Sequence, residues 1–115
     1  MKKTLDEKRV SELRALAAAE LPRRVEYYSE KMGLYPTSVK ITSAATRFGS
    51  CSGKNSICFS YRLMLYPPEA VDYVVVHELA HIKEKNHSAR FYALVGRYMP
   101  DYREREKLLK KTPKL

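Results

Sequence analysis

Three histidines, His77, His81 and His87, lie within eleven residues, and the sequence contains no others. The first two enclose Glu78 in an HExxH pattern. Residues four apart share one face of a helix, so the imidazoles of His77 and His81 can bind a single cation. Glu78 lies about 100° further round such a helix, where its carboxylate can act on a water beside the metal. The spacing therefore predicts a metal centre that activates water.

A catalytic zinc site needs a third protein ligand and one open position. His87 follows His77 by ten residues and is the histidine left to supply that ligand. We expect Asn86 to adopt a left-handed conformation that turns His87 back towards the other two. Two other interpretations stay open at this point: half-buried histidines without a metal, and a structural zinc that also uses thiols.

The two cysteines, Cys51 and Cys58, are candidates for zinc ligands or nucleophiles. Zinc-binding cysteines usually come in closer pairs, whereas six residues separate these two. If all three histidines bind the metal, none is left to activate a thiol. We therefore expect two ordinary free thiols.

The first 37 residues are predicted to form a mainly helical N-terminal part. Thr4 and Glu7 fit a capping box at the start, and apolar residues then recur every three or four positions over residues 10–32. Pro22 interrupts this stripe, which predicts either a kink or the first residue of a second helix. Gly33 is the expected end.

The middle of the chain is predicted to form a small sheet. Residues 39–42 alternate and are rich in β-branched side chains, while residues 45–51 and 56–63 flank a turn at residues 52–55. Three short strands are not stable alone, so we expect a helix against one face.

The rest of the chain is predicted to be helical again. Pro68 is placed to begin a helix that reaches about Lys85 and contains the HExxH pattern. Ser88 can cap a second helix that ends near Met99, and a last helix reaches about Lys110.

Together these elements predict one α+β domain over residues 1–115. Its parts are a helical N-terminal part (1–37), strands (38–66), and the active-site and C-terminal helices (67–111). We expect a minimal domain in which a three-stranded sheet packs against the HExxH helix.

Composition narrows the possible functions. The chain has 44% apolar residues, yet no run approaches the roughly 18 that a membrane helix needs. Acidic and basic residues interrupt the N-terminal region, so we expect no secretory signal and a cytoplasmic protein. The formal charge of +9 raises the possibility of a nucleic-acid partner, but acids interleave with the basic residues along the chain.

Three segments resemble the YgjP-like zinc metallopeptidases, which are zincins similar to the WLM and SprT groups. These segments are residues 47–52 (RFGSCS), residues 67–81 (PPEAVDYVVVHELAH), and residues 86–88 (NHS) followed by Phe91. The resemblance spans roughly residues 38–112. A metzincin would have the third histidine at the same offset but glycine at position 84, where this chain has Glu84.

The resemblance implies a minimal zincin fold in which His77, His81 and His87 bind Zn²⁺ and Glu78 is catalytic. Two positions depart from the family pattern: Phe48 replaces a usual Trp and Ser60 a usual Asn. We expect both to affect packing or hairpin hydrogen bonds more than the metal. Family members commonly carry an N-terminal extension that is missing here, so the chain is expected to be a compact member or an excised catalytic core.

The predicted function is zinc-dependent hydrolysis of a peptide or protein substrate, with Glu78 as the general base. We expect an extended substrate to pair with a sheet edge near residues 56–61. The alternatives are a nucleic-acid-associated protein that acts on nucleic-acid-bound proteins, and a zinc-stabilised scaffold without turnover. Further candidates complete the predicted site: Tyr92, Tyr98 and Arg90 for the oxyanion, and Asp72 and Asp101 for orienting a ligand histidine.

Overall fold

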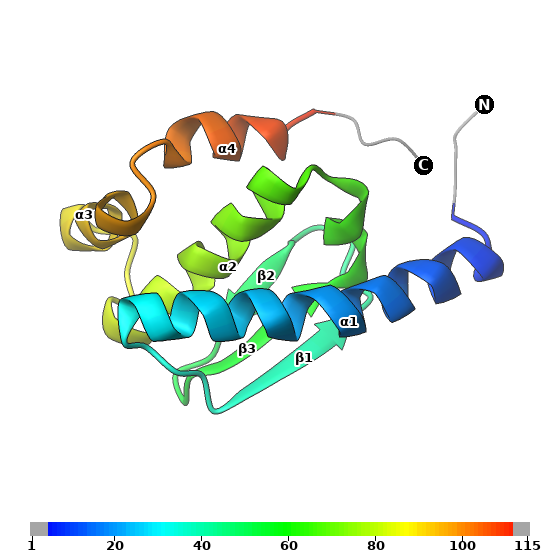
Figure 1. Cartoon of the computed structure of the whole chain (residues 1–115), viewed down its shortest axis with the longest axis horizontal. Helices are drawn as coiled ribbons and strands as arrows, with labels where there is room; N and C mark the ends of the chain where they lie inside the picture. The colour runs from blue at the N-terminus through cyan, green and yellow to red at the C-terminus, as the bar shows by residue number, and fades with distance from the viewer. Residues whose placement is uncertain (1–4, 112–115) are drawn as a thin grey trace.

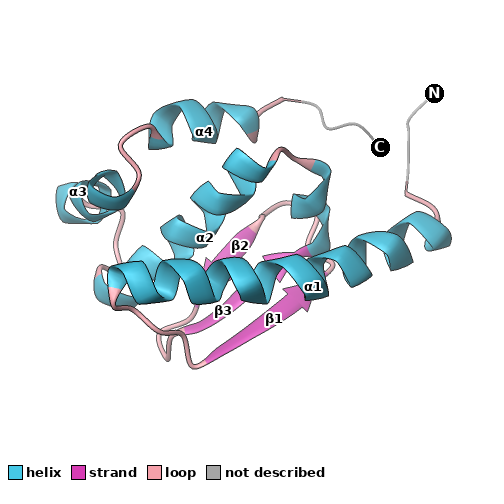
Figure 2. Ribbon diagram, in the orientation of Figure 1, coloured by secondary structure: helices cyan, strands magenta, loops and turns pink. Residues whose placement is uncertain are grey.

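A computed structural model describes residues 5–111 of the chain. Its elements in chain order are α1 (Glu7–Met32), β1 (Ser38–Thr42), β2 (Gly49–Cys51), β3 (Ser56–Ser60), the short 3-10 helix η1 (Tyr61–Leu65), α2 (Pro68–Lys83), α3 (Ala89–Tyr98) and α4 (Tyr102–Leu108). Helices α1 and α2 lie against the sheet, and α3 and α4 pack beside α2 (Figure 1; Figure 2). The expected α+β class, with a three-stranded sheet against the HExxH helix, is confirmed. None of the helices within residues 5–111 has the length and apolar character that a membrane span requires.

The sheet has the strand order β1-β3-β2, in which β1 is parallel and β2 antiparallel to β3. The expectation that residues 56–61 form an exposed edge is therefore wrong, because β3 is paired on both sides. The free edge next to the HExxH helix belongs to β2. Sequence patterns identified the strands, but not that β1 pairs with β3 across the intervening hairpin.

Two strands are shorter than predicted. β2 begins at Gly49, because the preceding loop is held instead by the Ser60 hydroxyl, which donates to the Ala44 carbonyl at 2.7 Å. The same hydroxyl accepts from the Arg62 amide at 3.2 Å and caps η1, so β3 ends at Ser60. The alternation of apolar residues continues through Leu63, which is why it resembled a longer strand.

Helix α1 passes through Pro22 without a break. Both Pro22 and Ala18, whose carbonyl loses its helical partner, are on the exposed side, where water can satisfy that carbonyl. The expected capping box is wrong in position: Asp6 is the N-cap and accepts from the Arg9 amide at 2.7 Å. Thr4 lies outside the described residues. Gly33 ends the helix at φ 68°, as predicted.

The core lies between the helices and one face of the sheet. Ile57 and Phe59 of β3 are completely buried, whereas Cys58 between them is only partly covered. Buried positions of α1 recur from Leu13 to Met32 at helical spacing and contact α2. The HExxH helix is buried over most of its length, which fixes its position against β2.

The chain leaves α2 in an extended conformation at Glu84, with φ −119° and ψ 102°. The expectation of a left-handed Asn86 is wrong, since Asn55 is the non-glycine residue with positive φ within residues 5–111. Ser88 caps α3 as predicted, and its hydroxyl accepts from the Phe91 amide at 3.4 Å. His87 therefore reaches the site through an extended loop.

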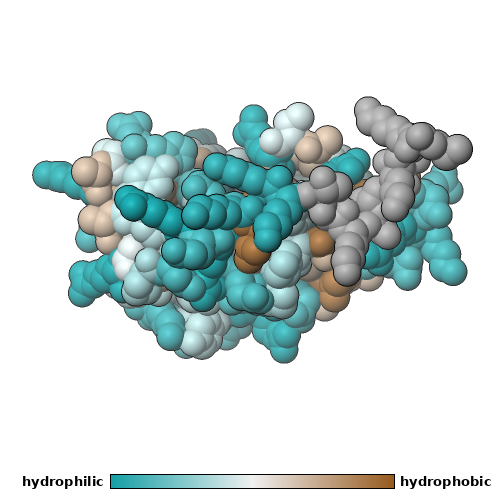
Figure 3. All heavy atoms as spheres, turned by 90° about the horizontal axis from the view of Figure 1, so that it is seen from above, coloured by the Kyte–Doolittle hydropathy of each residue, from teal (hydrophilic) through white to brown (hydrophobic). Residues whose placement is uncertain are grey.

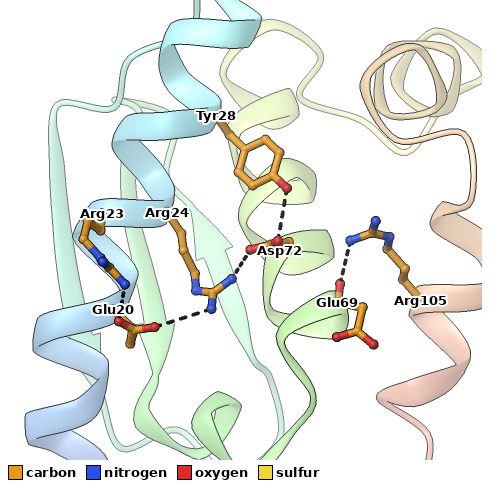
Figure 4. A network of polar contacts seen from close by, with 7 residues as sticks. All are labelled: Glu20, Arg23, Arg24, Tyr28, Glu69, Asp72 and Arg105. Atoms are coloured by element: carbon orange, nitrogen blue, oxygen red, sulfur yellow. Dashed lines mark hydrogen bonds and ion pairs between the residues drawn. The ribbon is translucent and has the colours of Figure 1, made fainter.

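A polar network joins the outer side of α2 to α1 (Figure 4). The Asp72 carboxylate accepts from the Arg24 guanidinium and, at 3.1 Å, from the Tyr28 hydroxyl. Burial, followed by the nearby Asp72 charge, raises the pKa of Tyr28 to about 12, so this hydroxyl stays protonated and donates. Asp72 was expected to orient a ligand histidine; it instead fixes the HExxH helix against α1.

Replacing Asp72 by asparagine is expected to lower the free energy of unfolding by about 1–3 kcal/mol, since a partly buried Arg24 loses its charged acceptor. Chemical denaturation of the metal-free protein measures this without the contribution of a bound ion. The matched control is Asp101→Asn, because Asp101 is 56% exposed and pairs with Arg105, four residues later in the chain. That control should cost less than about 1 kcal/mol. Equal losses in both variants would contradict a specific role for the Asp72 network.

Candidate metal centre

The three histidines converge at the C-terminal end of α2. His77 and His81 lie one turn apart on α2, and His87 lies in the loop before α3. One ring nitrogen from each falls within 4.8 Å of the others, and the Nε2 atoms of His81 and His87 are 3.0 Å apart. Ligand nitrogens about 2.0–2.1 Å from a tetrahedral zinc would be roughly 3.3 Å apart, so the donor type and the separation of His81 from His87 fit this metal.

The hydrogen bonds of the rings leave nitrogens free for a metal. Nδ1 of His81 donates to the Glu84 carbonyl at 2.9 Å, which directs Nε2 towards His87. Burial is the main cause that lowers the pKa of His81, so its imidazole is neutral and able to coordinate. Nδ1 of His77 lies 3.2 Å from Oε2 of Glu78. This contact leaves Nε2 as the nitrogen of His77 that can bind a metal.

Phe91 forms a common apolar support for the three rings. It is completely buried and stacks on His81 with ring centroids 4.3 Å apart and an interplanar angle of 20°. The rings of His77 and His87 meet it edge to face at 4.9 and 5.1 Å. The Ser88 cap sets the start of α3 and hence the position of Phe91, three residues later. One aromatic side chain thus limits the rotation of all three imidazoles.

Glu78 lies between the metal cluster and the β2 edge. It is 5% exposed, and its backbone belongs to the buried face of α2. A Cβ at Gly49 would come within 3.1 Å of Glu78 Cγ and 3.2 Å of Oε2. The absence of a side chain at this β2 position therefore lets the HExxH helix approach the sheet and holds the carboxylate in one place.

Gly49→Ala is expected to reduce the turnover number about 10-fold or more, because the added methyl displaces Glu78 by a few tenths of an ångström. Zinc content should stay at the wild-type value, since the three atoms nearest to the added methyl belong to Glu78 and Val74 and not to a histidine. Steady-state kinetics on the metal-loaded protein measures the effect. Gly53→Ala, at a position where an added Cβ meets nothing within 4 Å, is the matched control. Wild-type turnover in the Gly49 variant would show that the carboxylate tolerates displacement.

Two hollows meet at Glu78. One, of about 220 Å³, is lined by the three histidines together with residues of β2 and Lys85. The other, of about 180 Å³, is lined by Phe48, Tyr73, Glu106 of α4 and the following Leu109, among others. Gly49, His77 and Glu78 border both, so the two hollows are adjacent, and together they are called the groove of the candidate site.

The remaining predicted residues lie at different distances from this groove. Tyr92 stacks against His87 with centroids 6.2 Å apart. Tyr98 instead pairs with the Arg97 guanidinium at 5.7 Å, and Arg90 is exposed on α3. Neither Tyr98 nor Arg90 is among the described residues that line the two hollows, so the structure gives no support to these two oxyanion candidates. Asp101 bonds to Arg105 and orients no histidine.

Both thiols are free, as expected. Cys51 faces the helix side of the sheet, opposite Ile57, and borders the histidine hollow, while Cys58 pairs with Ser50 on the other face. Burial raises the pKa of Cys51, although the Lys85 charge acts in the opposite direction. A protonated thiol is a poor nucleophile and metal ligand, so the chemistry of the site rests with the histidines and Glu78.

Sequence reasoning missed two residues of the site. Gly49 had a detectable signal, since it belongs to the RFGSCS segment just before the turn. Lys85 had none: its ammonium reaches across to the hairpin and donates to Asn55 Oδ1 and, at 3.3 Å, to the Ser52 carbonyl. Of the two departures from the family pattern, Phe48 meets Tyr66 edge to face at 4.9 Å and also lines the hollow that borders Glu78, and Ser60 holds the loop before β2 by a hydrogen bond.

Two solved metallopeptidase zymogens have similar folds. Abylysin of Pyrococcus abyssi superposes with a TM-score of 0.69 and 23% identity, over 77% of this chain and 90% of that one. Jannalysin of Methanocaldococcus jannaschii gives 0.68 and 21% identity, over 79% of this chain and 95% of that one. At these identities the likeness shows a shared fold.

Sequence comparison adds a curated relative and a family. UTP pyrophosphatase of Escherichia coli is 31% identical over 81 residues, which are 69% of this chain and 48% of that protein. The chain thus spans about half the length of this curated relative. The family model for the YgjP-like metallopeptidase domain matches residues 3–112, which include the histidine cluster, Glu78 and the β2 edge. This chain belongs to the YgjP-like metallopeptidase-domain family.

Proposed function

We propose that this protein is a zinc-dependent metallopeptidase in which His77, His81 and His87 hold the ion and Glu78 is the general base. The observation that carries the proposal is the convergence of three imidazole nitrogens within 4.8 Å beside a buried carboxylate. Family membership and the metallopeptidase fold support the same class of chemistry. Within the described residues the cluster offers three donors, which favours an open fourth position over a closed scaffold site.

When bound, zinc supplies a Lewis acid that lowers the pKa of a water ligand to about 7 and polarises the scissile carbonyl. Glu78 accepts the proton of the attacking water and then transfers it to the departing amine. Burial keeps the carboxylate close to the reacting atoms and limits competing water. The Glu84 carbonyl and Phe91 hold His81 in the orientation that coordination needs.

The free edge of β2 supports a peptide substrate. An extended segment can add to this edge through main-chain hydrogen bonds, as peptides do on exposed strands. Gly49 and Ser50 belong both to β2 and to the histidine hollow, so a segment paired there runs past Glu78. This placement replaces the predicted edge at residues 56–61.

A second candidate function is hydrolysis of a nucleoside triphosphate to the monophosphate and pyrophosphate. The relative from Escherichia coli is a UTP pyrophosphatase, and its similarity covers 69% of this chain. The same metal and general base can activate water for attack at phosphorus. The net charge of +9 also favours an anionic substrate.

One assay separates the two candidates. Zinc-loaded protein is incubated with an unfolded protein substrate and, separately, with UTP, and new peptide termini and pyrophosphate are measured. New termini that disappear in Glu78→Gln support the peptidase. Pyrophosphate release that needs Glu78, with no peptide cleavage, would replace it with the second candidate.

Association with nucleic acid stays a prediction based on charge. Neutralisation of phosphates by lysine and arginine releases counterions, so binding would weaken steeply as salt rises. Titration of labelled single- and double-stranded DNA at low salt tests it, and no binding under that condition would remove the idea.

A further inference from the structure

A third and larger hollow of about 760 Å³ lies between α3 and α4. Ala89, Tyr92 and Ala93 of α3 form one side, and residues of α4 and the following turn form the other. The face that contains α4 is mainly hydrophilic (Figure 3). The volume of the α3–α4 hollow falls within the range of pockets that bind small molecules and cofactors. It is therefore large enough for a ligand of the size of a nucleotide.

Three cations line this hollow: Arg103, Lys107 and Lys110. Among residues 5–111, none of them has a carboxylate partner within ion-pair distance. Arg103 and Lys107 are four residues apart on α4, where like charges repel and cost free energy. An anion in the hollow would relieve that repulsion.

The acid that lines the same hollow, Glu106, is already engaged. It accepts from the Tyr73 hydroxyl at 3.3 Å, and burial together with the Glu106 charge raises the pKa of Tyr73, so that hydroxyl remains a donor. Glu106 also lines the hollow that contains His77 and Glu78. Glu106 is therefore a side chain that the α3–α4 hollow shares with the hollow beside His77 and Glu78.

Two tyrosines give the hollow an aromatic wall. The rings of Tyr92 and Tyr102 stack with their centroids 5.9 Å apart and an interplanar angle of 21°. Tyr92 also stacks against His87. The Arg103 guanidinium lies 5.7 Å from the Tyr102 ring centroid. Unpaired cations beside aromatic faces are the combination that binds phosphates together with a nucleobase.

We propose that the α3–α4 hollow binds a nucleoside triphosphate, with its polyphosphate on Arg103, Lys107 and Lys110. The choice of a nucleotide rests on the second candidate function above, whereas the cationic site rests on the geometry of α3 and α4. In this arrangement the phosphates lie on the α4 side, and Glu106 borders both this hollow and the one beside His77 and Glu78. An acidic peptide is the competing occupant, but it lacks the base that the tyrosine wall accommodates.

The test is isothermal titration of UTP into zinc-loaded Glu78→Gln protein at low salt, so that the ligand is not consumed. UTP should bind at least 10-fold more tightly than UMP. Arg103→Gln/Lys107→Gln should weaken UTP about 10-fold or more, with zinc content unchanged. The control is Lys8→Gln/Lys40→Gln, which removes the same charge from exposed positions on α1 and β1 and should change affinity less than twofold.

Equal weakening in both double variants would overturn the proposal, because net charge alone would then explain binding. A hexaglutamate peptide that binds as tightly as UTP would assign the hollow to an acidic segment and also overturn it. If inorganic triphosphate binds as tightly as UTP, the base makes no contribution to affinity, and the assignment of a nucleoside triphosphate to the hollow would be overturned. UTP binding that depends on Arg103 and Lys107, without pyrophosphate release by the wild-type protein, would support the site and remove the second candidate function.

Discussion

Replacing Glu78 by glutamine is expected to reduce the turnover number by about 10²–10⁴-fold while the protein keeps its zinc. The amide has the same shape and can still accept from Nδ1 of His77, so the ring that Glu78 contacts stays in place. It cannot take a proton from water, which is the step assigned to the carboxylate. Turnover and metal content measured on the same preparation separate catalysis from coordination.

A matched control for this change is Glu12→Gln, which removes the same charge from an exposed position on α1. It should behave as the wild type in both turnover and zinc content. A Glu78→Gln protein that hydrolyses its substrate at the wild-type rate would show that another group accepts the proton. Loss of zinc in that variant would instead show that the carboxylate supports the metal rather than the reaction.

Replacing His87 by alanine is expected to weaken zinc binding by more than about 100-fold. Mutation of residues that merely orient a metal ligand already lowers metal affinity by about 10–100-fold, and loss of a ligand should cost more. Nε2 of His87 lies 3.0 Å from that of His81, and the described residues offer no fourth member of the cluster to replace it. Competition with a chromophoric chelator measures the affinity. Because metal binding contributes to folding, a chelator should also lower the Tm of the wild type more than that of the variant.

Asn86→Ala is the control, since Asn86 is an exposed neighbour in the same loop and takes no part in the cluster. Its zinc affinity should equal that of the wild type. Unchanged affinity in His87→Ala would contradict the three-histidine site and would point to Glu84 or a water as the third ligand.

The HExxH helix and its histidines were predictable from sequence because the information is local. Spacing of four residues places His77 and His81 on one face, and Pro68 marks the start of α2. The caps at Gly33 and Ser88 depend on side chains within three residues and were also recognised correctly. The sequence also predicted that His87 joins the cluster. It attributed this to a left-handed conformation of Asn86, which the structure does not show.

Features that depend on distant contacts could not be predicted in this way. The parallel pairing of β1 with β3 makes β2 the edge beside the site, and no pattern within either strand specifies its neighbour. Asp72 was expected near a histidine because it precedes His77 by five residues, yet its side chain points to Arg24 and Tyr28 on α1. The positions of Gly49 and Lys85 at the site likewise depend on how the hairpin packs against α2.

The charge of +9 also acquires a more specific interpretation from the structure. Along the sequence, acids interleave with the basic residues, so the sequence alone indicated no particular binding site. Folding gathers three of the basic residues in one hollow beside the groove, while Arg24 and Arg105 form ion pairs elsewhere. The distribution in space, rather than the total charge, identifies where an anion can bind.

The most direct test of the metal centre is elemental analysis of the protein purified without a histidine tag and without added metal. The convergence of His77, His81 and His87 predicts about one zinc per chain, removable by a chelator and restored on addition of zinc. A folded protein that contains no zinc and cannot take it up would contradict the account, because the three imidazoles would then not form a metal site.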